Sequence, residues 1–138
     1  MSIKGADIRN IAVIGHSGEG KTSVVEAILF NGGTTDRLGK VTDGNTVTDC
    51  DEQEIARKMS ISLSMAYTMW DGVKLNLLDV PGFYDFEGEE NEALRAAGGA
   101  LIVTGATGTL TVGAEKAIDK CLKNKIPMVV FINGVDKD

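Results

Sequence analysis

The glycine-rich stretch GHSGEGKT, residues 15–22, is the most informative motif of this chain. It matches the pattern G-x-x-x-x-G-K-[ST], in which successive backbone N–H groups turn inward around an anion. The pattern binds phosphate where a strand feeds a tight turn that opens a helix, because the N–H groups and the helix dipole then face the ligand. A glycine-rich turn that matches only by chance would lack these flanks.

Both flanks are present. Upstream, residues 10–14 form a short apolar run rich in β-branched side chains, which predicts a strand. Downstream, a helix is predicted to begin in the loop and to end near residues 31–33. Its apolar side chains fall on one face, at Val24, Val25, Ile28 and Leu29. The stretch is therefore predicted to be a phosphate-binding loop made of Gly15, His16, Ser17, Gly18, Glu19, Gly20, Lys21 and Thr22.

The side chains of this loop have separate predicted roles. Lys21 is predicted to reach the β- and γ-phosphates of a nucleotide, and the Thr22 hydroxyl is predicted to bind Mg²⁺. His16 is the only histidine of the chain, and we interpret it as a solvent-facing loop residue.

The composition of the chain narrows the classes of protein and of partner that fit it. The chain has 138 residues, 43% of them hydrophobic, which is ordinary for one globular domain. Its net charge of −6 argues against diffuse attraction to nucleic acid or to anionic lipid. The amino terminus resembles no signal peptide and no run is long enough to cross a bilayer, so we expect a cytoplasmic protein. Cys121 shares the apolar face of a predicted helix, and we interpret it as a core thiol.

The remaining pattern predicts an α/β fold. A long polar stretch over residues 32–58 is interpreted as a functional loop. Strict alternation over residues 60–69 predicts a half-buried strand, and Asp71-Gly72 a hairpin turn into an antiparallel strand over 73–79. Later elements are predicted over residues 100–103 (strand), 112–123 (helix) and 126–133 (strand). This order predicts a P-loop NTPase, with a mostly parallel sheet, one antiparallel hairpin strand and helices on both faces.

Two further motifs follow the ends of predicted strands. In an open α/β sheet, ligands bind beyond the carboxyl ends of the strands, so Asp79 is predicted to lie beside the phosphate loop and to hold Mg²⁺. The Gly82 N–H is predicted to reach a terminal phosphate. Asn133 and Asp136 end the last strand at the same edge, and an aspartate there can accept two N–H bonds from guanine. Either motif alone is also a common turn.

These motifs, in this order, resemble the GTPase domain of elongation factor G and its bacterial paralogues. The resemblance rests on GHSGEGKT, DEQEIARKMSI (51–61), LLDVPGFYDFEGEENEALRAAGGALIV (77–103), VGAEKA (112–117) and FINGVD (131–136). It implies binding of GTP, GDP and Mg²⁺, hydrolysis of GTP, and contact with the ribosome through a full-length protein. It also implies a single incomplete GTP-binding domain over residues 1–138, with a family strand and helix still to follow. No membrane, no direct DNA contact and a monomeric state are expected.

The resemblance assigns roles to individual residues, with three departures. It implies that Ser60 is the hydroxyl of the first switch, where the family usually has threonine. It assigns Lys21, Gly82 and the residue at position 83 to catalysis, but Phe83 stands where the family carries a water-orienting histidine. Phenylalanine can neither donate nor accept a hydrogen bond. Gly134 replaces a lysine whose stem covers the base.

Three functions therefore remain open on the sequence. The first is a GTPase switch, in which Thr22, Ser60 and Asp79 hold Mg²⁺ and Asn133 and Asp136 hold the base. The second is a nucleotide-binding switch with little or no hydrolysis, which Phe83 favours. The third is an ATPase or kinase that shares only the phosphate loop, which the pair Asn133 and Asp136 disfavours.

Overall fold

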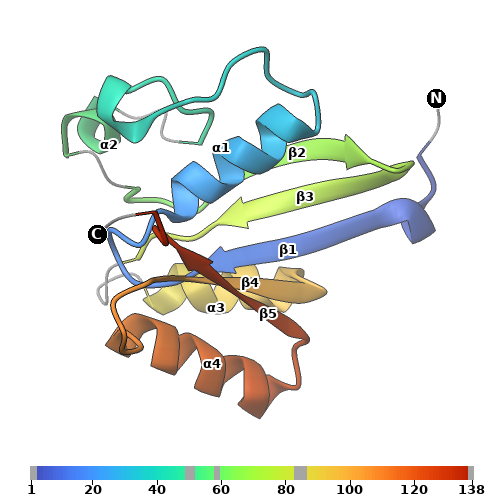
Figure 1. Cartoon of the computed structure of the whole chain (residues 1–138). Helices are drawn as coiled ribbons and strands as arrows, with labels where there is room; N and C mark the ends of the chain where they lie inside the picture. The colour runs from blue at the N-terminus through green and yellow to red at the C-terminus, as the bar shows by residue number, and fades with distance from the viewer. Residues whose placement is uncertain (1–2, 49–51, 58–59, 83–86, 137–138) are drawn as a thin grey trace.

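A five-stranded sheet forms the centre of the computed structural model, which describes residues 3–48, 52–57, 60–82 and 87–136 (Figure 1). Its strands lie in the order β2-β3-β1-β4-β5. Strand β1 pairs in parallel with β3 and β4, β4 pairs in parallel with β5, and β2 pairs antiparallel with β3. The strands are β1 (Ile8–Ile14), β2 (Ser64–Trp70), β3 (Val73–Asp79), β4 (Gly99–Gly105) and β5 (Met128–Asn133). The predicted α/β class and the antiparallel hairpin are confirmed.

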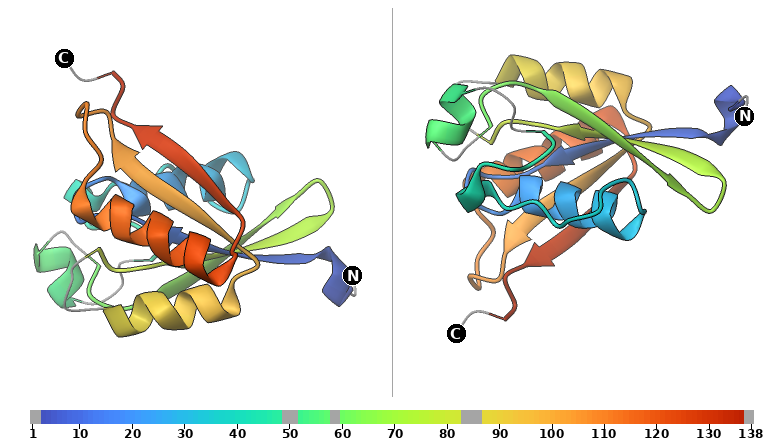
Figure 2. Two further views of the ribbon diagram at one scale, coloured as in Figure 1. Left: turned by 90° about the horizontal axis from the view of Figure 1, so that it is seen from below. Right: turned by 90° about the horizontal axis from the view of Figure 1, so that it is seen from above.

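Helices cover both faces of the sheet. Figure 1 shows α1 above the sheet and α3 and α4 below it, and the two views of Figure 2 agree. The helices are α1 (Lys21–Asn31), α2 (Glu52–Arg57), α3 (Glu87–Ala96) and α4 (Val112–Asn124), with short 3₁₀ turns at Gly5–Asp7 and Val41–Asp43. Each face has its own apolar core, because side chains of a strand alternate between faces. On the α1 face the core includes Val13, Val25, Leu29, Leu77 and Val103. On the other face it includes Ile14, Leu78, Leu94, Ile102 and Cys121.

The strand predicted over residues 60–69 begins later than the alternation indicates, at Ser64. The strand is half-buried, but its buried side chains are the small ones, Ala66 and Thr68. Thr68 accepts a hydrogen bond from the Thr34 hydroxyl at 2.7 Å, and a Cβ on Gly32 would collide with it, so the end of α1 allows only a small side chain here. Met65, Tyr67 and Met69 face the opposite side of this edge strand and are exposed.

Two helices were not predicted from the sequence pattern. Helix α2 lies inside the polar stretch that we interpreted as a loop, and α3 follows the strand-end motif of Asp79. Both are rich in charged residues, so neither carries the wide apolar stripe by which an amphipathic helix is recognised. Strand β5 is apolar but is not fully buried. It lies at the edge of the sheet, and Val129 and Ile132 are 66% and 58% exposed.

Cys121 lies in the core under α4, as predicted, and is fully buried with a free thiol. Burial raises the pKa of this thiol, and the nearby Glu90 carboxylate raises it further. Because the thiolate is the reactive form, a raised pKa and burial both slow its modification. We expect DTNB to modify Cys121 of a Cys50→Ser variant at least about ten-fold more slowly in the native chain than in urea at pH 8. Equal rates in the two states would contradict the buried position.

Candidate nucleotide site

The loop over residues 15–20 connects the carboxyl end of β1 to the first turn of α1. Gly18 and Gly20 have φ angles of 81° and 87°, in the left-handed region that glycine adopts without strain. Gly15 is required for a different reason, since a Cβ there would collide with the carbonyl of Val103 on β4. The predicted strand, loop and helix are therefore present in the order that a phosphate-binding loop needs.

The Lys21 side chain folds back over this loop. It is 7% exposed, and its Nζ donates to the backbone carbonyl of His16 at 3.0 Å. Gly82, which follows β3, lies against the same group. A Cβ on Gly82 would collide with the Lys21 Nζ and would come within 2.6 Å of the Ser17 backbone nitrogen. The lysine, a loop N–H and the Gly82 backbone thus line one small space that only a glycine leaves open, which suits a phosphate group.

Hydroxyl groups and a carboxylate meet where α1 begins and β3 ends. Asp79 is fully buried, and its Oδ2 accepts hydrogen bonds from Thr22 at 2.8 Å and from Thr48 at 3.0 Å. The Ser60 hydroxyl lies 3.1 Å from that of Thr22. The structure therefore brings Thr22, Ser60 and Asp79 together, as the metal prediction requires. Thr48 was not predicted, because nothing in its polar surroundings distinguishes it from other loop threonines.

Asn133 joins the end of β5 to the loop. Its side-chain Nδ2 donates to the backbone carbonyl of Glu19 at 2.9 Å, and its backbone carbonyl accepts from the Ala106 N–H at 3.0 Å. Gly134 follows with a φ of 71° and turns the chain. Asp136 lies in this turn with its side chain exposed. Asn133, which we predict to contact the base, thus borders the phosphate loop at the same edge of the sheet as Asp79.

His16 is not the solvent-facing residue that we predicted. The first turn of α4 packs against it so closely that a Cβ on Gly113 would lie 2.9 Å from its Cα and Cβ atoms, and its Nδ1 is buried. The contact joins residues almost a hundred positions apart, which the sequence alone could not bring together. Phe83 and Tyr84, the other residues considered for catalysis, lie outside the described residues.

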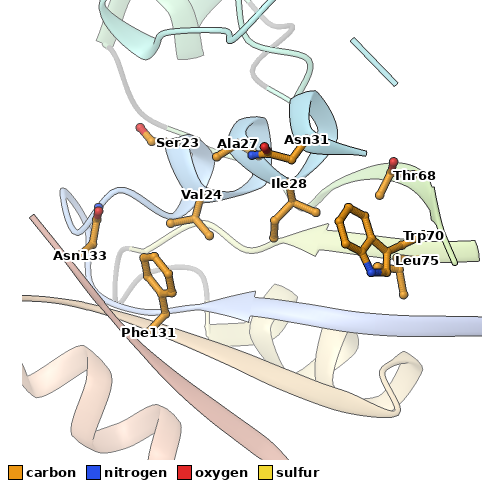
Figure 3. Close-up of a pocket in the computed structure, with 10 residues that line it drawn as sticks. All are labelled: Ser23, Val24, Ala27, Ile28, Asn31, Thr68, Trp70, Leu75, Phe131 and Asn133. Atoms are coloured by element: carbon orange, nitrogen blue, oxygen red, sulfur yellow. The ribbon is translucent and has the colours of Figure 1, made fainter. Parts of the chain in front are cut away.

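A pocket of about 490 Å³ lies beside this site, between α1 and strands β2, β3 and β5 (Figure 3). Asn133 lies at one end of it and Trp70 at the other. Between them the lining is mostly apolar, and includes Val24, Ile28 and Phe131. Such a lining offers no cation for phosphates, so the nucleotide chemistry belongs to the loop and not to this pocket.

Across residues 3–48, 52–57, 60–82 and 87–136, no three His, Cys, Asp or Glu side chains cluster closely enough to hold a metal ion. The hydroxyl-rich arrangement around Asp79 is the metal candidate that remains. Within the same ranges, the helices are too short or too polar to span a bilayer.

The fold and the loop define this chain as a P-loop nucleotide-binding domain. Residues 6–138 match the family model described as the elongation factor Tu GTP binding domain, and the chain belongs to this family. It is therefore a GTP-binding domain of the type found in elongation factor G-like factors.

Individual relatives agree with this membership. An elongation factor G-like protein of Mycobacterium tuberculosis is 40% identical over 129 residues, which is 94% of this chain and 18% of the relative. A mitochondrial ribosome-releasing factor 2 of Drosophila willistoni is 39% identical over 132 residues, 96% of this chain and 18% of the relative. A crystal structure of a Thermus thermophilus protein superposes with a TM-score of 0.90 at 36% identity, covering 97% of this chain and 20% of that one. The chain thus spans 18% to 20% of the length of these proteins.

Proposed function

We propose that this chain binds GTP and GDP with Mg²⁺, hydrolyses GTP, and acts as the switch domain of an elongation factor G-like translation factor. The observation that supports it most is the hydrogen bond from Asn133 to the Glu19 carbonyl, 2.9 Å long. It joins the base-recognition motif to the phosphate loop, so one ligand can contact both. A protein that recognised phosphates alone would not need this connection.

The chain's own groups suit Mg²⁺ and phosphate. Hard oxygen ligands are those that Mg²⁺ prefers, and Thr22, Ser60 and Asp79 would hold it directly or through water. When bound, the ion neutralises charge that develops on the β- and γ-phosphate oxygens. Lys21 would leave the His16 carbonyl and donate to those oxygens, and the Gly82 N–H would donate to the terminal phosphate. Desolvation strengthens these contacts, because Lys21 and Asp79 are buried.

Nucleotide turnover would change the surface of this domain. The terminal phosphate contacts two segments, around Ser60 and after Asp79, that join the sheet at only one end each. Loss of that phosphate removes a shared ligand from both segments and releases them. The relatives are named as elongation and ribosome-releasing factors, so we infer that the ribosome is the partner that responds. A switch that binds GTP without hydrolysing it is the alternative that Phe83 favours.

The first test is direct binding to the purified chain. Calorimetry with GDP, GTP and ATP, each with Mg²⁺, should give binding of both guanine nucleotides and at least about 100-fold weaker binding of ATP. Two lost hydrogen bonds to a charged acceptor account for a difference of this size. Equal affinity for ATP and GTP would favour the ATPase reading, and absence of any nucleotide binding would reject the proposal.

Base selectivity should depend on Asp136. Its carboxylate can accept from both N–H groups of guanine, whereas an asparagine amide would present a donor where guanine also donates. We expect Asp136→Asn to weaken GDP binding by about 5- to 150-fold and to favour xanthosine diphosphate instead. Titration of both diphosphates into the variant measures the exchange. Unchanged GDP affinity would mean that Asp136 is not at the base.

A further inference from the structure

The segment that connects α1 to β2 is bound by carboxylate side chains from three different helices. Each accepts hydrogen bonds from backbone N–H groups of this connection, and those of Glu26 and Glu54 are 1% and 4% exposed. The pairs are Glu26 with Val47 at 2.6 Å, Glu54 with Ile61 at 2.9 Å and Ser62 at 3.1 Å, and Glu89 with Leu63. The N–H groups of Ile61, Ser62 and Leu63, which precede β2, are therefore satisfied by carboxylates outside the sheet.

Glu54 holds this connection most directly. One of its oxygens, Oε1, accepts from two successive N–H groups, those of Ile61 and Ser62. Bonds to an ionised acceptor are stronger than neutral ones, and more so when water is excluded. Two bonds to successive peptide units also fix their orientation, which a single bond would not. The backbone immediately after Ser60 is therefore held against α2.

The position of Ser60 is what this contact secures. Its hydroxyl lies 3.1 Å from that of Thr22, and Thr22 donates its own hydrogen to Asp79 at 2.8 Å. Ser60 is therefore the donor to Thr22, which leaves the lone pairs of the Ser60 oxygen able to act as a metal ligand. Thr22 and Asp79 belong to α1 and β3, which the sheet fixes. Ser60 belongs to neither, so its hydroxyl depends on the contacts of the connection.

We propose that Glu54 is a positioning residue that directs the Ser60 hydroxyl to the metal and so favours GTP over GDP. The inference rests on the proposed nucleotide-binding function and adds to it the group that sets the triphosphate preference. Thr22 and Asp79 serve a metal bound with either nucleotide. Ser60 would add a further ligand from a segment that the proposed function assigns to contact with the terminal phosphate, so its loss should weaken triphosphate binding selectively.

The test compares Glu54→Ala with the unmodified chain, using GDP and the slowly hydrolysed analogue GMPPNP, each with Mg²⁺. We expect the variant to bind GMPPNP about ten-fold more weakly, since it loses two bonds to a charged acceptor, and GDP within about two-fold of the unmodified chain. Glu54→Gln should recover most of the loss, because its amide oxygen can accept the same two N–H bonds. Glu92→Ala is the matched control, since Glu92 is an exposed carboxylate on α3.

Amide hydrogen exchange in the nucleotide-free chain measures separately whether Glu54 restrains the backbone at Ile61 and Ser62. The amides of Ile61 and Ser62 should exchange faster in Glu54→Ala than in the unmodified chain, and not in Glu92→Ala. Equal weakening of GDP and GMPPNP, or unchanged binding of both, would overturn the inference while leaving nucleotide binding intact. Failure of the unmodified chain to bind either nucleotide would reject the proposed function, and the inference with it, even if the exchange rates responded.

Discussion

Lys21→Ala should remove nucleotide binding from this chain while leaving its fold in place. The Nζ of Lys21 lies beside the space that Gly82 leaves open, and it is the cation that the phosphate loop supplies from within α1. In GDP the lysine would meet only the β-phosphate, and a charge-assisted bond is worth about 1.5–3 kcal/mol, so its loss predicts about a 10- to 150-fold weaker affinity for GDP. Calorimetry with Mg²⁺ and GDP measures this change directly.

The fold should tolerate the substitution, because the hydrogen bond of Lys21 to the His16 carbonyl is part of a loop and not of either core. Circular dichroism and thermal unfolding of the variant should match those of the unmodified chain to within a few degrees. Lys123→Ala is the control, since Lys123 is an exposed lysine at the end of α4. Wild-type affinity in Lys21→Ala would exclude the loop as the phosphate site.

The parts of the fold that the sequence predicted are those encoded locally. The phosphate loop is a contiguous motif between an apolar strand and an amphipathic helix, and the Asp71-Gly72 turn fixes the neighbouring hairpin. Asp71 and Gly72 do adopt positive φ angles, 52° and 82°, as that turn requires. Helices α2 and α3 were missed because both are rich in charged residues. Helix α2 is held through the Glu54 carboxylate, and α3 adds only the apolar contact of Ala93 and Leu94 to the bond made by its Glu89 carboxylate.

The residues of the candidate site likewise include some that the sequence could place and some that it could not. Asp79 and Asn133 could be placed near the loop from the sequence, because parallel strands end at one edge of the sheet. Thr48 and Glu54 could not, since they lie in polar sequence and meet their partners only through the path of the connection. The half-buried position of His16 could not be predicted because its neighbour, Gly113, lies in the first turn of α4, far along the chain. Contacts between irregular segments therefore account for most of what the sequence left undetermined.

Hydrolysis should be slow, and Phe83 is the reason that the sequence offers. The residue follows Gly82 in the sequence, and the Gly82 backbone lies beside Lys21 and Ser17. Groups that orient water or transfer protons contribute about 10²–10⁴-fold to such reactions, and phenylalanine can do neither. We expect Phe83→His in the full-length protein to raise single-turnover hydrolysis of Mg²⁺-GTP by about 100-fold or more when ribosomes are present.

Two comparisons assign this effect to the side chain. Phe83→Leu keeps an apolar side chain and should hydrolyse GTP as slowly as the unmodified chain, whereas GDP affinity should be the same in all three proteins. If the histidine and leucine variants turn over equally, water is oriented by another group, and Tyr84 is the neighbouring candidate. A fast unmodified chain would likewise reject Phe83 as the cause of slow turnover. Because binding depends on Lys21 and the loop while turnover depends on position 83, the two measurements can fail independently, and together they separate a GTPase from a switch that only binds.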